Sequence, residues 1–206
     1  MIVREFPGEE NGVLPCDVWR RCSDWLKRST AVAAGPGWGE VQAGILAGLR
    51  DYNGPVVLDA DALNLLARNP ALWTEKENIV ITPHPGEAAR LARAFGVSSG
   101  SREELCRQLA GKLKAVVLLK GKFTRIASPD GRESVILSGS PALATAGSGD
   151  VLTGIIGALL AMGVPPYESA VLGSSLHGRA GEIAGRGCIA DDLPLILRDI
   201  LKELGK

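Results

Sequence analysis

The stretch PALATAGSGD, residues 141–150, runs directly into the apolar segment Val151–Met162, and the interpretation of the whole chain starts from it. Its small residues and two glycines allow a tight turn with consecutive exposed N–H groups, and the apolar segment is typical of a buried helix. Those N–H groups would lie at a helix N-terminus, which favours a bound anion such as phosphate. A carboxylate at Asp150 beside phosphate suggests a base for a hydroxyl that attacks phosphorus.

The same stretch also fits a simpler interpretation, in which Ser148 or Asp150 caps the helix. It matches neither the P-loop pattern nor the dinucleotide-binding glycine pattern. The residues of this stretch alone therefore leave an anion site and an ordinary helix cap as open alternatives.

The composition indicates one globular domain whose function lies in a local site. The chain has 206 residues, and its 46% hydrophobic content is ample for a core. Lysines plus arginines equal aspartates plus glutamates at 23 each, so no global basic field recruits nucleic acid or acidic membranes. We expect a single domain over residues 1–206, with no nucleic-acid or membrane partner.

The four cysteines show no CxxC spacing, and the chain has only two histidines, which argues against a zinc cluster. Reduced thiols are the simplest interpretation. The longest apolar run is too short to cross a bilayer, and the first residues lack a basic-then-apolar signal pattern. We therefore expect a cytoplasmic protein.

Strands and helices alternate along most of the chain, and two strands near the middle form a hairpin signal around Pro129–Gly131. This alternation predicts a three-layer α/β domain with a mainly parallel sheet. The expected strands are Ala31–Ala34, Pro55–Leu58, Asn78–Ile81, Ala115–Leu119, Phe123–Ala127 and Ser134–Leu137. The expected helices are Asp17–Ser29, Val41–Leu49, Glu87–Phe95, Arg102–Lys114, Val151–Met162, Ser169–Ala184 and Leu193–Leu204, and Met1–Pro15 is expected to form an irregular start.

Chemically interesting residues follow the expected strands, where open α/β sheets bind ligands. The loop Gly35–Gly39 lets backbone approach a ligand closely, or is an ordinary glycine turn. Asp59 and Asp61 either cap the following helix or hold a hydrated magnesium ion. Capping is the simpler interpretation for Asp61.

His84 lies between two prolines, which present it on a rigid turn and suggest contact with a substrate. Glu87 falls in the first turn of the next helix, where the helix dipole stabilises a negative charge. Lys120 either steadies phosphates or solvates a strand end. His177, within a helix of small residues, is interpreted as a hydrogen-bonded core histidine.

Five motifs in this order resemble those of the ADP- or ATP-dependent NAD(P)H-hydrate dehydratases, a family of the ribokinase-like superfamily. The resemblance extends from about residue 30 to about residue 190 and implies a ribokinase-like α/β/α fold. The motifs are GPGWG (35–39), VVLDADALNLLA (56–67), ITPHPGEAARL (81–91), VVLLKG (116–121) followed by Thr124, and PALATAGSGDVLTGIIGALLAMG (141–163).

The resemblance implies removal of water from the hydrated nicotinamide ring of NADH or NADPH, at the cost of one nucleotide phosphoanhydride. ADP is favoured over ATP, and Mg²⁺ is expected to bridge the phosphates, with ligands that the sequence does not identify. The implied hydrate-binding residues are Gly37, Gly39, His84 and Asp150, with Asp150 as catalytic base. The implied nucleotide-binding residues are Lys120, Gly121, Lys122, Phe123, Thr124, Gly147, Ser148 and Gly149.

Two alternatives use the same residues: a ribokinase-like kinase of a small molecule such as a hydroxymethyl pyrimidine or thiazole, and a nucleotide-binding protein without catalysis. The chain departs from the family in having only 34 residues before Gly35, where members usually carry another strand–helix–strand unit. It also has Ser140–Leu143 where members often show Asn-Pro followed by Met. We therefore expect a homo-oligomer in which a neighbouring chain helps to close the hydrate side of the site.

Overall fold

The computed structural model of the chain describes residues 20, 22–39, 46, 48–49, 51–73, 75–76, 78–98 and 100–205. Within them lies a six-stranded sheet whose spatial order follows the sequence order. The first four strands are parallel, and the last two are antiparallel to their neighbours, so the expected mainly parallel sheet is confirmed. The strands are β1 (Val32–Ala34), β2 (Val56–Leu58), β3 (Ile79–Ile81), β4 (Val116–Leu119), β5 (Thr124–Ala127) and β6 (Glu133–Ile136).

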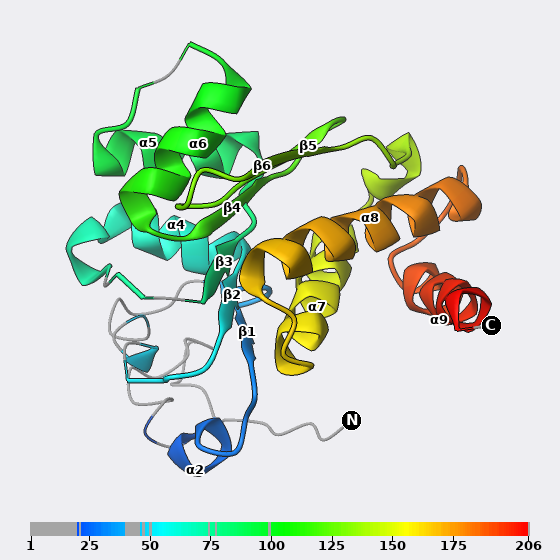
Figure 1. Ribbon diagram of the computed structural model, residues 1–206, viewed down its shortest axis with the longest axis horizontal. Coiled ribbons are helices and arrows are strands. Elements are labelled where there is room, and N and C mark those ends of the chain that lie inside the picture. Colours follow the sequence, from blue (N-terminus) through cyan, green and yellow to red (C-terminus); the bar gives the residue numbers. More distant parts are fainter. Residues whose placement is uncertain are drawn as a thin grey trace.

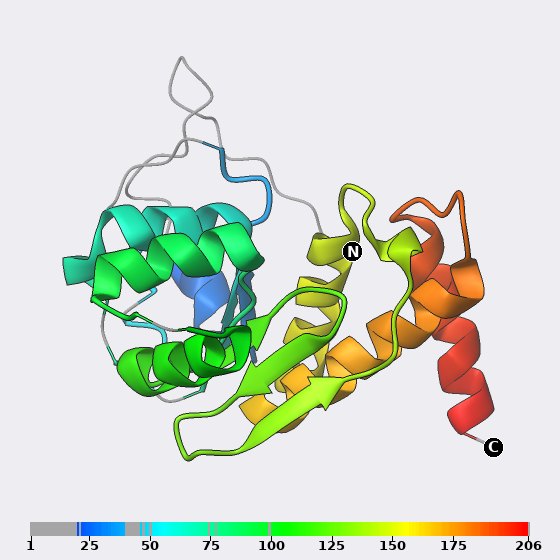
Figure 2. The same cartoon turned by 90° about the horizontal axis from the view of Figure 1, so that it is seen from above.

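Helices cover both faces of this sheet, as expected for a three-layer α/β/α fold (Figure 1). Among the described helices, three lie on one side of the sheet and two on the other, with a further helix packed outside the second layer. Figure 2 shows the two groups apart. The first group is α4 (Ala60–Arg68), α5 (Pro85–Phe95) and α6 (Arg102–Leu113). The second is α7 (Ser148–Ala161) and α8 (Pro166–Ala184), with α9 (Asp192–Leu204) outside; single turns are α2 (Ser23–Leu26), η1 (Pro70–Leu72) and η2 (Pro141–Leu143).

Several helices begin earlier than the sequence predicts, because residues that are common in loops, such as proline, also suit the first turn of a helix. Pro85 and Pro166 occupy the first turns of α5 and α8, where a missing N–H group costs nothing. The helix expected from Val151 already begins at Ser148. The irregular start Met1–Pro15 and most of the expected helix 41–49 lie outside the described residues. Within the expected helix 17–29, Arg20 and α2 are described as helical.

Alternating side chains of the central strands form two cores. In β3, Ile79 and Ile81 pack with the cluster beneath α4, α5 and α6, whereas Val80 packs with the cluster beneath α7 and α8. In β4, Val117 belongs to the first cluster and Leu118 to the second, and both are completely buried. Burial on both faces explains why these strands read as continuous apolar runs, because every side chain leaves water.

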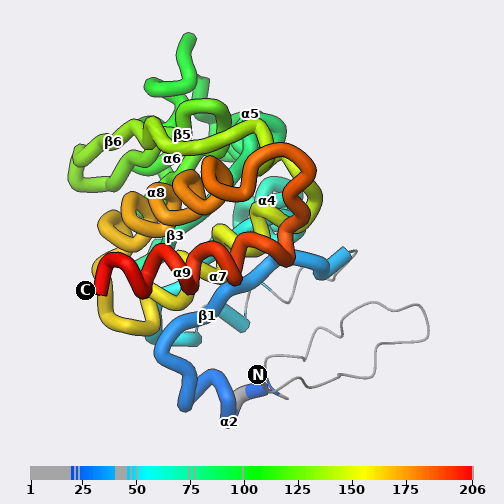
Figure 3. The backbone as a smooth tube through the Cα atoms, turned by 90° about the vertical axis from the view of Figure 1, so that its right-hand side faces the viewer, coloured from blue at the N-terminus to red at the C-terminus, as the bar shows by residue number. Residues whose placement is uncertain are grey.

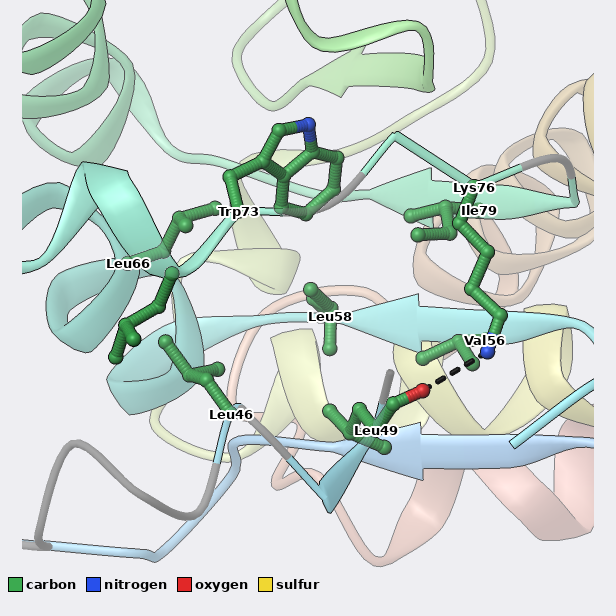
Figure 4. A pocket seen from close by; sticks show the side chains of 9 residues that line it. Leu46, Leu49, Val56, Leu58, Leu66, Trp73, Lys76 and Ile79 are labelled. Carbon is green, nitrogen blue, oxygen red and sulfur yellow. Dashed lines mark hydrogen bonds between the residues drawn. The ribbon is translucent and has the colours of Figure 1, made fainter. Parts of the chain in front are cut away.

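A small hollow remains on the face of β2 and β3 that α4 covers (Figure 4). Its volume is about 40 Å³, and its lining is apolar except for Lys76, whose Nζ donates a hydrogen bond to the Leu49 carbonyl at 2.8 Å. A hollow of this size has room for water molecules but is far smaller than the pockets that bind small-molecule ligands.

The outermost helix, α9, adds a third small core against α7 and α8, built around Leu193 and Leu197. Figure 3 shows α9 and α7 on one face of the molecule. No described helix is both long enough and apolar enough to pass through a lipid bilayer.

The end of β1 depends on a glycine. Gly35 has φ +120°, and a Cβ atom added there would overlap the Asp59 carbonyl oxygen and lie 2.8 Å from Ala62 Cβ. We expect Gly35→Ala to lower the free energy of unfolding by about 2–4 kcal/mol, because backbone strain and steric overlap add. Urea denaturation followed by circular dichroism measures this loss.

Gly37→Ala is the matched control for this prediction. Gly37 also has a positive φ, +70°, but nothing lies within 4 Å of an added Cβ atom. Only the conformational cost of roughly 1–2 kcal/mol is expected there. Equal losses in the two variants would show that contact with Asp59 does not fix Gly35.

Candidate functional site

Side chains that could bind a ligand or take part in catalysis lie at the carboxyl ends of the parallel strands. Hydrogen bonds between neighbouring chain segments continue past the ends of β1 to β4 and hold the following loops side by side. Backbone hydrogen bonds therefore fix the positions of the loops that follow these strands, without any contribution from side chains. The bonds run from Asp59 N to Ala34 O (3.0 Å), from Thr82 N to Leu58 O (3.1 Å) and from Lys120 N to Pro83 O (2.9 Å).

The turn at the start of α7, residues 145–149, has the geometry of an anion-binding loop, and we call it the anion loop. Gly147 is the N-cap residue with φ 84°, and its carbonyl accepts from the N–H groups of Asp150 (3.0 Å) and Val151 (3.1 Å). Among the described residues, the N–H groups of Gly147 and Gly149 have no hydrogen-bond partner, whereas Ser148 N donates to Thr145 O at 3.3 Å. Of the N–H groups of Gly147, Ser148 and Gly149, those of the two glycines are therefore open to a ligand.

Neither Ser148 nor Asp150 caps α7 with its side chain, so the capping interpretation of this stretch is wrong. Ser148 is buried, and its Oγ lies 3.1 Å from His177 Nε2 on α8. Burial lowers the pKa of His177 to about 4, which keeps the ring neutral near pH 7. His177 is a hydrogen-bonded core histidine, as predicted, and its partner is the Ser148 hydroxyl group.

The chain that leads into this loop lies directly on α8. Ideal Cβ atoms on Gly178 and Gly181 would collide with Ser138 and Leu143, so glycines at these positions allow the close approach. Gly139 N also donates to Glu182 Oε1 at 3.0 Å. The segment that precedes the anion loop is thus held against α8.

A buried ion pair lies beneath the anion loop. Lys120 Nζ is 2.7 Å from Asp59 Oδ1, and Thr153 Oγ1 donates to Asp59 Oδ2 at 2.9 Å. An ideal Cβ atom on Gly149 would lie 3.5 Å from Lys120 Nζ, so Lys120 does more than solvate a strand end. Asp59 occupies the N-cap position of α4 but makes no capping hydrogen bond, which excludes the capping alternative for its side chain.

The glycine loop after β1 is held by Asp61, whose Oδ2 accepts a hydrogen bond from Gly39 N at 2.9 Å. The interpretation of Asp61 as a helix cap is therefore wrong, because its carboxylate turns towards the neighbouring loop. Gly37 and Gly39 have φ values of 70° and 63° with open space beside them. The backbone there is accessible, as expected for a loop that receives a ligand.

His84 begins α5 and forms a capping box with Glu87. Its Nδ1 accepts from Gly86 N at 3.0 Å, and Glu87 Oε2 accepts from His84 N at 2.8 Å. His84 Nε2 lies 3.4 Å from Glu87 Oε1, so both ring nitrogens face protein atoms while half of the side chain stays exposed. Burial raises the pKa of Glu87, which the His84 N–H bond opposes.

The segment 120–123 connects β4 to β5, and its residues 121–123 are exposed. Phe123 is 44% exposed, and the Lys122 ammonium group lies 5.4 Å from the centroid of its ring. Thr124 Oγ1 donates to Gly121 O at 3.3 Å. Arg102 Nη2 donates to Lys120 O at 3.1 Å, and no sequence signal pointed to this arginine.

Two of the three aspartates described at the site have protein partners, and the third is exposed. Asp59 binds Lys120 and Thr153, and Asp61 binds Gly39, while Asp150 is exposed at the first turn of α7. In the described part of the chain, no three metal-ligating side chains form a cluster. This donor set fits Mg²⁺ only as an ion held mainly by nucleotide phosphates and water, which is common for this ion.

A sequence profile described as NAD(P)H-hydrate dehydratase matches residues 10–202, which is most of the chain. The chain belongs to the NAD(P)H-hydrate dehydratase family. The ADP-dependent (S)-NAD(P)H-hydrate dehydratase of Neisseria meningitidis is 46% identical over 158 residues, which cover 74% of this chain and 53% of that protein. The match spans 30–53% of the length of eight curated relatives.

Solved structures agree with this family assignment and with the fold. The ADP/ATP-dependent NAD(P)H-hydrate dehydratase of Bacillus subtilis, co-crystallised with ATP and Mg²⁺, matches with a TM-score of 0.70 and 27% identity. The match covers 91% of this chain and 72% of that one. A ribokinase-like superfamily protein from Enterococcus faecalis matches with a TM-score of 0.75 at 22% identity, covering 91% of this chain and 68% of that one, and shows the shared fold.

The capping box at His84 generates a pH-dependent prediction. A carboxyl group whose pKa rises on folding adds stability that is complete below the unfolded-state pKa, about 4.3 for glutamate, and is lost as pH rises through the folded-state pKa. Glu87→Gln keeps the capping oxygen but does not titrate. We expect the free energy of unfolding of the wild type, relative to Glu87→Gln, to fall as pH rises from below 4.3 (approximately) towards neutral.

Denaturant unfolding at a series of pH values measures this difference. Glu87→Ala serves as the control, because it removes the capping oxygen and should cost about 1 kcal/mol near neutral pH relative to Glu87→Gln. A difference between wild type and Glu87→Gln that stays constant across the pH series would contradict the raised pKa.

Proposed function

We propose that this protein is an ADP-dependent (S)-NAD(P)H-hydrate dehydratase, which restores hydrated NADH or NADPH by phosphorylation and elimination of phosphate. The observation that carries the proposal is the juxtaposition of the Lys120 ammonium group with Gly149 at the start of α7, one residue before Asp150. A phosphate-binding lysine, open N–H groups and a carboxylate base are the parts that phosphoryl transfer to a hydroxyl requires. The relative from Neisseria meningitidis carries the same activity in its name.

The proposed residue roles divide the site into two halves. The hydrate half consists of the backbone at Gly37 and Gly39, the side chain of His84 and the base Asp150. Their support is the open backbone of the glycine loop and the rigid capping box at His84. The nucleotide half consists of Lys120, Gly121, Lys122, Phe123, Thr124, Gly147, Ser148 and Gly149. Its support is the exposure of residues 121–123 and the distance of 3.5 Å between an ideal Cβ atom on Gly149 and Lys120 Nζ.

In the first step, the hydroxyl oxygen on the nicotinamide ring attacks the terminal phosphorus of ADP, and AMP leaves with the electrons of the broken phosphoanhydride bond. Asp150 accepts the hydroxyl proton. The N–H groups of Gly147 and Gly149 stabilise the charge that develops on the phosphoryl oxygens, a contribution of roughly 3 kcal/mol for each well-placed donor. Mg²⁺ bound with the nucleotide would neutralise phosphate charge.

In the second step, phosphate leaves the ring carbon. The lone pair of the ring nitrogen expels it, and loss of a proton from the adjacent ring carbon restores the dihydropyridine. Phosphate leaves far more readily than hydroxide, which is why a phosphoanhydride is consumed. The products are NADH or NADPH, AMP and inorganic phosphate.

Product analysis tests this function. Hydrated NADH is incubated with ADP, with ATP or with neither, and the absorbance of reduced nicotinamide, AMP and free phosphate are followed together. We expect NADH and phosphate to appear in equal amounts with ADP. A stable phosphorylated product identifies a small-molecule kinase instead, and nucleotide binding without turnover identifies a non-catalytic protein.

Asp150→Asn is the variant for the same assay. The amide keeps the size of the side chain and loses the base, so turnover should fall by about 10²–10⁴-fold while the fold is retained. Asp150 is exposed, so its substitution leaves the core intact. Turnover within about threefold of wild type would remove Asp150 from the role of base.

A homo-oligomer stays a prediction. Within the described residues, β1 pairs only with β2 and therefore lies at an edge of the sheet, where exposed hydrogen-bonding groups attract a partner. We expect ADP binding to survive dilution to the monomer better than dehydration does. Light scattering with both measurements over a concentration series checks this, and a fully active monomer contradicts it.

A further inference from the structure

The Asp59 carboxylate joins three separate segments of the chain below the proposed nucleotide site. It is 1% exposed, and both of its oxygens have partners. Oδ1 accepts from Lys120 Nζ after β4, and Oδ2 accepts from Thr153 Oγ1 in the second turn of α7. A buried carboxylate with this pair of donors has one fixed orientation, because each oxygen is held separately.

This arrangement places the Lys120 ammonium group where a phosphate would meet it. An ideal Cβ atom on Gly149 lies 3.5 Å from Lys120 Nζ and 3.6 Å from Asp59 Oδ2, so the anion loop passes close above the ion pair. In the described structure, Asp59 is the one hydrogen-bond acceptor of Lys120 Nζ. An ammonium group has three N–H donors, which leaves two for phosphoryl oxygens.

Lys120 cannot leave Asp59 without a large penalty. The side chain of Lys120 is 22% exposed and that of Asp59 is 2% exposed, so separation would leave a buried carboxylate without its counter-charge. Other charged or titratable groups lie nearby on neighbouring elements, namely Glu87 on α5 and His177 on α8, but neither bonds to Lys120 Nζ. The ammonium group is therefore held in place before any nucleotide arrives.

We propose that Asp59, oriented by Thr153, is a positioning residue for phosphoryl transfer, which holds the Lys120 ammonium group against the first turn of α7 so that it meets the transferred phosphoryl group. This inference rests on the function proposed above. Asp59 acts through Lys120 and touches no substrate atom itself.

The proposed role has a distinctive kinetic signature. Asp59 carries a negative charge near the phosphates, so its loss does not weaken the overall attraction between the site and ADP. What is lost is the fixed position of Lys120, on which stabilisation of the transition state depends. A positioning role therefore lowers kcat and spares the affinity for ADP, whereas a role in folding alone changes neither in a folded variant.

The experiment uses the full chain with Asp59→Asn, which keeps the shape of the side chain and removes its charge. We expect kcat for dehydration to fall by about 10- to 100-fold, the usual cost of losing the partner of a site group. The Kd for ADP, measured by calorimetry, should stay within about threefold of wild type or become tighter. Ile126→Val, a conservative change in the core, controls for general destabilisation.

A double-mutant cycle with Lys120→Met tests whether Asp59 acts through Lys120. If it does, adding Asp59→Asn to Lys120→Met lowers kcat by no more than about threefold further. If Lys120→Met alone fails to fold, the cycle lacks one corner, and a crystal structure with ADP decides the question instead. Independent, multiplicative losses would overturn the proposal.

A crystal structure with ADP decides the same question without an activity assay. We expect Lys120 Nζ to contact Asp59 Oδ1 and a phosphate oxygen together. Lys120 bound to phosphate but separated from Asp59, or bound to Asp59 without contacting phosphate, overturns the proposal, as does an Asp59→Asn variant with kcat within about threefold of wild type or with greatly weakened ADP binding. If wild-type protein produces no NADH, the proposed function fails, and the crystal structure still decides the role of Asp59.

Discussion

The ion pair between Asp59 and Lys120 is the interaction on which the architecture of the site depends. A buried carboxylate needs a counter-charge, and the parallel sheet supplies one because β2 and β4 both end at the same edge. Thr153 ties this pair to α7, and the absence of a side chain on Gly149 lets the anion loop rest beside it. One electrostatic requirement thus links the sheet to the helix that bears the proposed base.

Most of the fold could be predicted from the sequence, because its signals are local. Apolar runs such as Ile79–Ile81 and Val116–Leu119 mark strands buried on both faces, and the turn at Pro129–Gly131 marks the hairpin of β5 and β6. Helix starts were less accurate because a helix begins with residues that also favour turns. Proline is rare inside a helix but suits its first turn, so α5 begins at Pro85 and not at Glu87 as predicted.

The chemical groups of the site were also predictable by type, but their mutual contacts were not. The sequence could offer two roles for Asp59 and two for Lys120, yet nothing in it indicated that the two side chains pair with each other. The capping role predicted for Asp61 is wrong for the same reason, because its partner is the backbone of Gly39, 22 residues away. The contact of Arg102 with the Lys120 carbonyl could not be predicted, because a single arginine at the start of a helix belongs to no recognisable motif.

These separations have a consequence for the order in which the protein assembles. Asp59 lies 61 residues from Lys120 and 94 residues from Thr153, so none of their contacts forms within a single hairpin or helix pair. Closing such long loops is entropically costly and is rewarded only after the intervening strands have paired. A newly synthesised chain is therefore expected to form its sheet first and the contacts among Asp59, Lys120 and Thr153 last. An assembled site would then indicate that the chain has finished folding.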